Sequence, residues 1–318
     1  MLIRGGVDLA RVAVRASDRL FEGAIFVIVG IVLAIFASLI VVLIDGAWPA
    51  MHLFGFGFIT HSGWDPVHLK FGAFPFIVGT VIVACGAMLL AVAIGLLTAV
   101  CITEILPHWF QSPIAYLIEL LAFIPSVVYG LFGLLVLAPF LQTRIQPWLL
   151  EHLGSRFPIF NGPPYGVGYL CAILILTIML IPLIVALSRE ALLLVPKSQK
   201  EAALALGSTR WQVISRVTVP YARNGIFGSM VLALGRALGE TMAVALTIGG
   251  GFKLPTTIMD QGYTLASVIA NEFNEVSSDT YLSALIYCGL ILFVMTVSVN
   301  IVAFFFVRKL EGAHGFKA

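Results

Sequence analysis

A charged pair lies within a long apolar stretch, in the segment Gly235-Arg236-Ala-Leu-Gly239-Glu240-Thr241-Met242. Arg236 falls about eleven residues into a predicted span that starts near residue 225, which places it close to the middle of a bilayer. An arginine there costs on the order of 2.5–3.5 kcal/mol to insert, so it is expected to have a partner or to line a wet cavity. Glu240 follows four residues later and is expected on the same helix face.

Two interpretations of this pair remain open on the residues alone. Arg236 and Glu240 could form a structural ion pair that holds helices in register. Alternatively, Arg236 binds an oxyanion, because a guanidinium offers a planar fork of donors and stays charged at physiological pH. Glu240 would then neutralise Arg236 in the empty site, or accept a hydrogen bond from a protonated oxyanion such as phosphate. The latter hypothesis predicts discrimination against sulfate, which has no proton to donate at neutral pH.

A proline lies deep in another apolar segment, in Ile124-Pro125-Ser126-Val-Val-Tyr129-Gly130. Pro125 removes a backbone donor and is expected to kink the helix at depth. The kink leaves carbonyl groups and the Ser126 hydroxyl available for hydrogen bonds. It therefore serves either helix packing or a polar pathway through the membrane.

The elements that must position these residues are membrane-spanning helices. Of the 318 residues, 60% are hydrophobic and 11% are charged, and the mean hydropathy is +1.05, as in an integral membrane protein. The apolar runs are continuous, which is typical of helices. Six segments have the roughly 20 residues that a crossing needs: 23–44, 74–101, 113–138, 166–188, 225–250 and 281–307. In the second, Gly79, Gly86 and Gly95 are expected to let helices pack closely.

The basic residues are divided unevenly between the two sides of this predicted topology. With both termini cytoplasmic, thirteen of the 18 Lys and Arg residues lie inside and four outside, while Arg236 lies within a span. This distribution places the segment 189–223 in the cytoplasm. The loops at 45–73, 139–165 and 251–280 are then external. Trp48 and Trp64 are expected to be interfacial anchors, and the last loop a solvated face.

The segment 189–223 is a polar island between two spans. Pro196 suits a helix start and Gly207 suits the left-handed residue that ends one. A second short helix is expected to follow and to stop at Pro220. The first helix gathers small apolar side chains around Ala202, so it would either fit a groove of a partner protein or rest on the membrane surface.

This segment resembles the signature loop of ABC importer permeases. Glu201-Ala202-Ala203 is followed after three residues by Gly207, and after nine more by Val217-Thr-Val-Pro220. Two valines stand where the family pattern has isoleucine and leucine. In that family the loop forms coupling helices that dock into the ATPase subunit. The resemblance therefore implies that the chain is coupled to an ATPase through Glu201, Ala202, Ala203, Gly207 and Pro220.

The two membrane motifs resemble those of the C-type permeases of phosphate-specific ABC importers, and Met242-Ala243-Val244 favours the C type over the related A type. The similarity runs from about residue 70 to 308. It implies an all-α integral membrane protein with six transmembrane helices and the type I ABC importer permease fold. It also implies a substrate pathway that includes Arg236, Glu240, Thr241 and Ser126.

The same resemblance implies a domain organisation and a set of partners. The chain divides into an N-terminal segment with the first helix and outer loop (1–72), a permease domain (73–307) and a cytoplasmic tail (308–318). The partners are a homologous A-type permease in a heterodimer, two ATPase subunits and a periplasmic or extracellular phosphate-binding protein. The complex would lie in the bacterial cytoplasmic (inner) membrane, with no nucleic acid bound.

Energy for transport is expected to come from outside this chain. The sequence has no G-x-x-x-x-G-K-[ST] loop, so ATP and Mg²⁺ are expected on the partner ATPase subunits, and the chain is expected to be neither an enzyme nor a cofactor or metal carrier. The four cysteines show no paired spacing. A permease for another oxyanion remains an alternative, as does a secondary transporter, although only Glu240 lies deep. No catalytic constellation of an intramembrane enzyme appears in the spans.

Overall fold

The computed structural model describes the backbone of residues 3–312 and the side chains of residues 21–305. Within that part of the chain the regular structure is almost entirely helical, and two short strands pair antiparallel, with Trp64 opposite Phe71. The predicted tail at 308–318 and the arginines of the first 20 residues lie outside the described side chains.

The helices are long where the sequence is apolar and short where it is polar. In chain order they are α1 (Ile3–Phe54), α2 (Gly57–Thr60), α3 (Phe74–Val100), α4 (His108–Ala122), α5 (Ser126–Phe132), α6 (Ala138–Phe140), α7 (Gln146–Leu149), α8 (Tyr169–Leu193), α9 (Lys197–Ala205), α10 (Arg210–Val213), α11 (Val219–Gly239), α12 (Met242–Thr247), α13 (Leu265–Glu272) and α14 (Asp279–Gly312). The strands are β1 (Trp64–Asp65) and β2 (Lys70–Phe71).

Five helical segments of the described chain are long and apolar enough to cross a membrane: Phe21–Phe54, Phe74–Ile105, Ser126–Gly154, Tyr169–Leu193 and Asp279–Phe305. The sixth predicted span, 225–250, corresponds to most of α11 together with α12. Each predicted span therefore has a helical counterpart. Two of them, 113–138 and 225–250, are interrupted where the sequence places its polar motifs.

α3 and α8 form the central pair of the bundle, and glycines set how closely they approach. A Cβ on Gly86 would lie 2.9 Å from Ile173, and one on Gly95 would lie 2.8 Å from Ile184. Both distances are shorter than packed side chains allow, so only glycine fits at these positions. The prediction that glycines in the second span permit close helix packing is confirmed.

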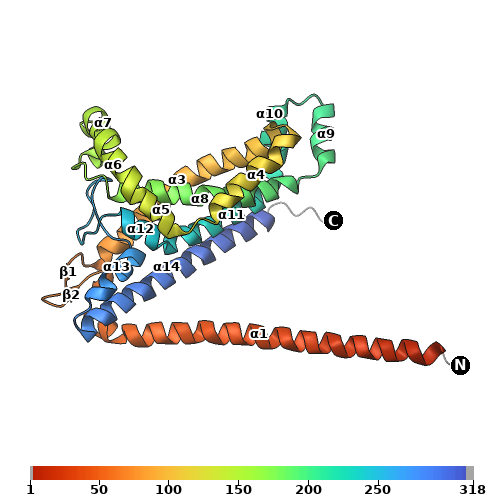
Figure 1. The fold of residues 1–318 in the computed structure, drawn as a ribbon, viewed down its shortest axis with the longest axis horizontal. Coiled ribbons are helices and arrows are strands. Elements are labelled where there is room, and N and C mark those ends of the chain that lie inside the picture. The colour runs from red at the N-terminus through yellow and green to blue at the C-terminus, as the bar shows by residue number, and fades with distance from the viewer. Residues whose placement is uncertain (1–2, 313–318) are drawn as a thin grey trace.

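The molecule has two distinct ends (Figure 1). α9 and α10 stand at one end, together with the start of α1 and the end of α14, whereas β1, β2, α6 and α7 lie at the other. α1 diverges from the bundle and touches α14 near its own C-terminal end. There the Ser283 hydroxyl donates to the Gly46 carbonyl and accepts from the Ala50 N–H, each at 2.9 Å.

The region predicted as an outer loop from residue 139 begins as helix instead. Helical backbone continues from α5 to Gly154, through α6 and α7 and three π-helical segments. Pro139 and Pro147 each come just after such a segment, where the wider turn relieves the ring's clash with the preceding carbonyl. The prediction that this loop starts at residue 139 is therefore wrong.

The end opposite α9 contains a second core rich in aromatic rings. Trp64 is only 7% exposed and packs edge-on against Phe71, Phe76 and Tyr281. Its prediction as an interfacial anchor is therefore wrong, because the β1–β2 hairpin folds it inward. Trp48, by contrast, is 60% exposed.

The predicted solvated face at 251–280 is also partly a packed element. α13 lies within it, and its first four residues are buried. The Glu272 carboxylate accepts hydrogen bonds from the Tyr263 and Tyr281 hydroxyls at 3.0 and 2.6 Å. This acid therefore joins α13 to the start of α14 rather than facing water alone.

Candidate functional site

The charged pair lies at a break between two helices. α11 ends at Gly239, and Glu240 adopts an extended conformation (φ −68°, ψ 122°) before α12 begins at Met242. The Glu240 Oε1 atom accepts a hydrogen bond from the Ala243 N–H at 3.3 Å, at the start of α12. The prediction that Glu240 shares a helix face with Arg236 is wrong, because the helix does not continue through residue 240.

Arg236 lies on a face of α11 that residues 21–305 leave exposed. Its side chain is exposed, whereas Ala233 and Ala237 on the same helix are buried in the central core. The three ion pairs found among the described side chains do not include Arg236 or Glu240. A Cβ on Gly239 would meet open space, so the end of α11 next to the break is also accessible.

α12 is held against α5 by two glycines. A Cβ on Gly130 would lie 2.7 Å from Leu246, and one on Gly133 would collide with Thr247 and lie 2.7 Å from Ile175. These glycines therefore let α12 approach the α5 backbone closely. The position of Glu240 at the start of α12 depends on this contact.

The proline motif also produces a break rather than the predicted kink. α4 ends at Ala122, and α5 begins at Ser126 immediately after Pro125. The Tyr129 hydroxyl reaches back across the gap and donates to the Leu121 carbonyl at 2.8 Å. Tyr129 is buried in the same core cluster as Ala237 of α11, so this break and the one after Gly239 share one packed region.

The remaining predicted pathway residues are half-buried at these two breaks. Ser126 is the first residue of α5, and Thr241 precedes α12, where its hydroxyl donates to the Gly239 carbonyl at 3.2 Å. Asn300 of α14 was not among the predicted residues. Its exposed amide lies beside α11, since a Cβ on Gly235 would be 3.6 Å from Asn300 Oδ1. An amide inside an apolar span is the signal that could have found it.

The second candidate region is the loop that carries α9 and α10. α9 begins after Pro196 and ends in a complete Schellman motif, in which Gly207 N–H bonds Leu204 O and Ser208 N–H bonds Ala203 O. Gly207 has φ +83°. The predicted helix start and glycine stop are confirmed.

No residue of α9 is buried. Its apolar side chains and those just beyond it are open to solvent, including Leu206 at 88% and Trp211 at 66% exposure. Glu201 and Ala202 are exposed as well, and Ala203 is half-buried. Figure 1 shows α9 standing away from the bundle. Such a surface suits a protein partner rather than water.

Pro220 does not end the second short helix. A π-helical segment, Ile214–Thr218, joins α10 directly to α11, and Pro220 lies in the first turn of α11. The wider π-helical turn before Pro220 accommodates a residue that lacks a backbone N–H and whose ring would clash with a preceding carbonyl. The predicted proline stop is wrong, and the loop is instead rigidly continuous with the helix that carries Arg236.

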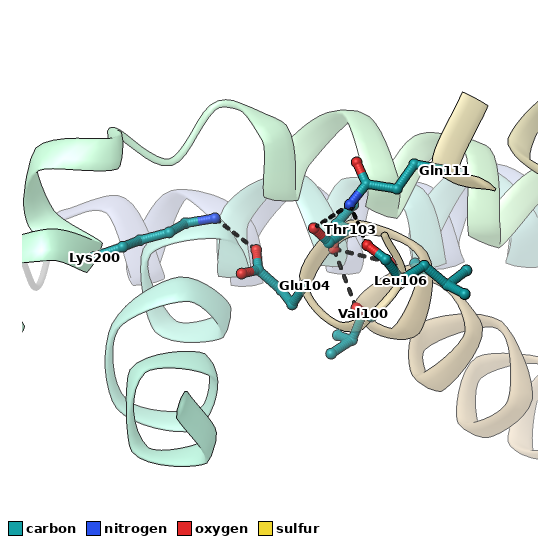
Figure 2. A network of polar contacts seen from close by, with 7 residues as sticks. Val100, Thr103, Glu104, Leu106, Gln111 and Lys200 are labelled. Carbon is teal, nitrogen blue, oxygen red and sulfur yellow. Dashed lines mark hydrogen bonds and ion pairs between the residues drawn. The ribbon is translucent and has the colours of Figure 1, made fainter. Parts of the chain in front are cut away.

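A network of polar contacts joins α9 to the turn between α3 and α4 (Figure 2). Lys200 Nζ lies 2.6 Å from Glu104 Oε1. Glu104 belongs to a π-helical segment, Cys101–Ile105, at the end of α3. From α4, Gln111 Nε2 donates to the Leu106 carbonyl at 2.8 Å. Nothing local in the sequence could have paired Lys200 with Glu104, because 96 positions separate them.

Residues 91–312 match the model of one protein family, described as binding-protein-dependent transport system inner membrane component. The chain belongs to this family. The match covers α11, α12, α14 and the loop that carries α9 and α10, so both candidate regions lie within the family domain.

Relatives of this permease are similar over most of their length. The phosphate transport system permease protein PstC of Mesorhizobium japonicum is 41% identical over 94% of this chain and 92% of its own. The probable PstC of Methanocaldococcus jannaschii is 34% identical over 83% of this chain and 85% of its own.

Solved ABC transporter structures share the permease fold. One is the MetNI methionine transporter in an inward-facing conformation, with a TM-score of 0.54 at 16% identity over 74% of this chain and 94% of that one. Another is a bacterial alginate transporter in complex with its alginate-bound periplasmic protein, with a TM-score of 0.55 at 19% identity over 88% and 94% of the two chains. The expected type I ABC importer permease fold is confirmed.

Proposed function

We propose that this chain is a permease subunit of an ATP-driven importer of inorganic phosphate. The names of the relatives, which are phosphate permeases in organisms as distant as a bacterium and an archaeon, support the substrate. The observation that carries the proposal is the exposed Arg236 at the break between α11 and α12. A guanidinium in an apolar helix is too costly to leave against lipid. It therefore faces a second protein subunit and a water-filled pathway.

The second subunit is a homologous A-type permease, and the translocation pathway runs between the two subunits. Arg236 binds the oxyanion through its fork of donors. Ser126 and Thr241 add hydroxyl groups from the two helix breaks. The uncovered face of α11 supports this arrangement, because a lone chain leaves one side of the pathway open.

Glu240 supplies the selectivity for phosphate in this proposal. Its Oε1 atom accepts a hydrogen bond from the Ala243 N–H, and Oε2 accepts a hydrogen bond from a phosphate hydroxyl. Sulfate at neutral pH would instead bring unprotonated oxygen against a carboxylate and be repelled. The two charges therefore act on the cargo separately and do not neutralise each other as an ion pair.

The loop carrying α9 and α10 docks on one of two ATPase subunits, which bind ATP and Mg²⁺. Ala202 and Ala203 form the contact face, Glu201 lies at its edge, and Gly207 and Pro220 fix the angles at which the loop leaves α9 and enters α11. The lack of buried residues in α9 supports this docking. The complex lies in the bacterial inner membrane with both termini of this chain in the cytoplasm, and a phosphate-binding protein delivers the substrate at the opposite end.

Reconstitution tests the proposal. Vesicles containing this chain, its permease partner and the ATPase subunits should take up radiolabelled phosphate when ATP is enclosed with the ATPase side and the binding protein is on the other. Uptake should vanish without the ATPase subunits, even under a proton or sodium gradient. Phosphate uptake driven by a gradient alone would contradict the proposal.

A further inference from the structure

An ion pair joins α9 to the helices of the bundle. The helix stands at the tip of the molecule and buries none of its own residues. Lys200 and Ala203 are the two residues of α9 that are not fully exposed; the Lys200 side chain is 23% exposed, and that of its partner Glu104 is 12% exposed. A charge-assisted contact of 2.6 Å at this depth is directional and short.

Glu104 lies in the turn between α3 and α4, which side-chain hydrogen bonds stabilise. The Thr103 hydroxyl donates to the Ala99 carbonyl at 3.0 Å within the end of α3. Gln111 of α4 donates to the Leu106 carbonyl at 2.8 Å and to the Thr103 carbonyl at 3.4 Å (Figure 2). The corner between α3 and α4 therefore holds the acid in place, and a displacement of Lys200 is passed to both helices.

Of the two helices that leave this corner, α4 leads to the break at Pro125, and α3 shares a core cluster with α8 and α11. α3 packs along α8 through Gly86 and Gly95. α4 ends beside Pro125, where the Tyr129 hydroxyl bonds Leu121, and Tyr129 is buried against the core that holds α11. A movement of α9 thus has a continuous packed route to the region of Arg236, in addition to the covalent route through α10.

We propose that the Lys200–Glu104 ion pair is the positioning contact that converts movement of α9 into movement of the α3–α4 corner. Lys200 and Glu104 are then coupling residues, which touch neither the nucleotide nor the cargo. This inference rests on the proposed docking of α9 on an ATPase. A purely stabilising role is a weak reason for such a pair, since removing two charges from water offsets most of their attraction.

The test uses the complete reconstituted complex and measures phosphate imported per ATP hydrolysed. Lys200→Met and Glu104→Gln should each lower that ratio at least fivefold, while the ATPase subunits still copurify in wild-type proportion and still hydrolyse ATP. The double variant Lys200→Glu with Glu104→Lys should restore at least half of the ratio. Glu190→Gln is the matched control, because it removes an ion pair between sequence neighbours in which the carboxylate is 68% exposed, and it should leave the ratio unchanged.

The possible results separate this inference from the proposed function. If the wild-type complex hydrolyses ATP but imports no phosphate, the proposed substrate is wrong, and the coupling inference is then judged by whether the variants still respond to the binding protein with increased hydrolysis. An unchanged ratio in both single variants overturns the inference. Loss of ATPase subunits from the variant complexes, in proportion to lost transport, also overturns it and identifies a structural tie.

Discussion

The loop that carries α9 and α10 and the break between α11 and α12 contain similar residues but are formed in different ways. At each, a glycine is followed by two residues, the second a threonine, and then by a new helix. Gly207 adopts φ +83°, and Thr209 forms a full capping box with Gln212. Gly239 stays helical, and Thr241 makes no cap, so Glu240 takes that role through Ala243. Local chemistry therefore specifies the loop, whereas packing elsewhere specifies the break.

The largest expected effect tests the break. Arg236→Met should lower phosphate uptake by the reconstituted complex by up to roughly 100-fold, because a charged hydrogen bond contributes up to about 3 kcal/mol. Arg236→Lys should retain part of the uptake, since it keeps the charge and loses the planar fork. Wild-type uptake by the methionine variant would show that the exposed guanidinium is not part of the pathway.

Packing beneath the break gives the next effect. Gly133→Ala should destabilise the complex by about 1–3 kcal/mol, since the new methyl group has no space between Thr247 and Ile175. Gly228→Ala is the matched control, because a Cβ there meets nothing within 4 Å and alanine is the better helix former. Thermal unfolding in detergent measures both. Equal melting temperatures would mean that α12 does not depend on its contact with α5.

Selectivity at the break separates the role of Glu240 from that of Arg236. Glu240→Gln should lower the preference for phosphate over sulfate about tenfold, equivalent to about 1.4 kcal/mol, because the amide no longer repels an unprotonated oxygen. Competition of unlabelled sulfate with labelled phosphate uptake gives the measurement. An unchanged preference in a variant that still transports would remove Glu240 from substrate selection.

A smaller effect, on binding of the proposed ATPase subunits, is expected in the loop that carries α9 and α10. Gly207→Ala adds a methyl group into open space, so its cost comes from the left-handed backbone alone and amounts to about 1–2 kcal/mol. Retention of the ATPase subunits during purification should fall by up to roughly tenfold. Ser208→Ala keeps the backbone donor of the Schellman motif and should behave as wild type. If both variants bind the ATPase equally, the angle of α9 is not set by Gly207.

The smallest effect lies in the loop after α12. Burial raises the pKa of the Asp260 carboxyl, but hydrogen bonds from Thr257 and Thr256 outweigh it and hold the pKa below its ordinary value. The carboxylate therefore contributes stability at neutral pH that is lost as the pH falls below about 4.

Asp260→Asn should accordingly lower stability at pH 7 by about 1 kcal/mol. The difference from wild type should shrink as the pH falls through the lowered pKa. Melting temperatures across that range measure it, with the exposed Glu275→Gln as control. A difference that grows in acid would contradict the assignment.

The sequence predicted what depends on short-range rules. The spans follow from continuous hydrophobicity, and the limits of α9 follow from Pro196 and Gly207. The sequence did not predict the features that depend on backbone geometry or on contacts between residues far apart in the chain. Pro220 and Pro139 are tolerated because π-helical turns precede them, and Trp64 is folded inward by a hairpin. The helix breaks after Gly239, where α12 packs on Gly130 of α5 and on Gly133 just after it.

The bare tip formed by α9 has a practical consequence for handling the protein. Leu206 and Trp211 are exposed when no second chain covers them. A concentrated preparation of the single polypeptide is therefore expected to aggregate through this surface. Co-production with the proposed ATPase subunits is then expected to give a more monodisperse sample.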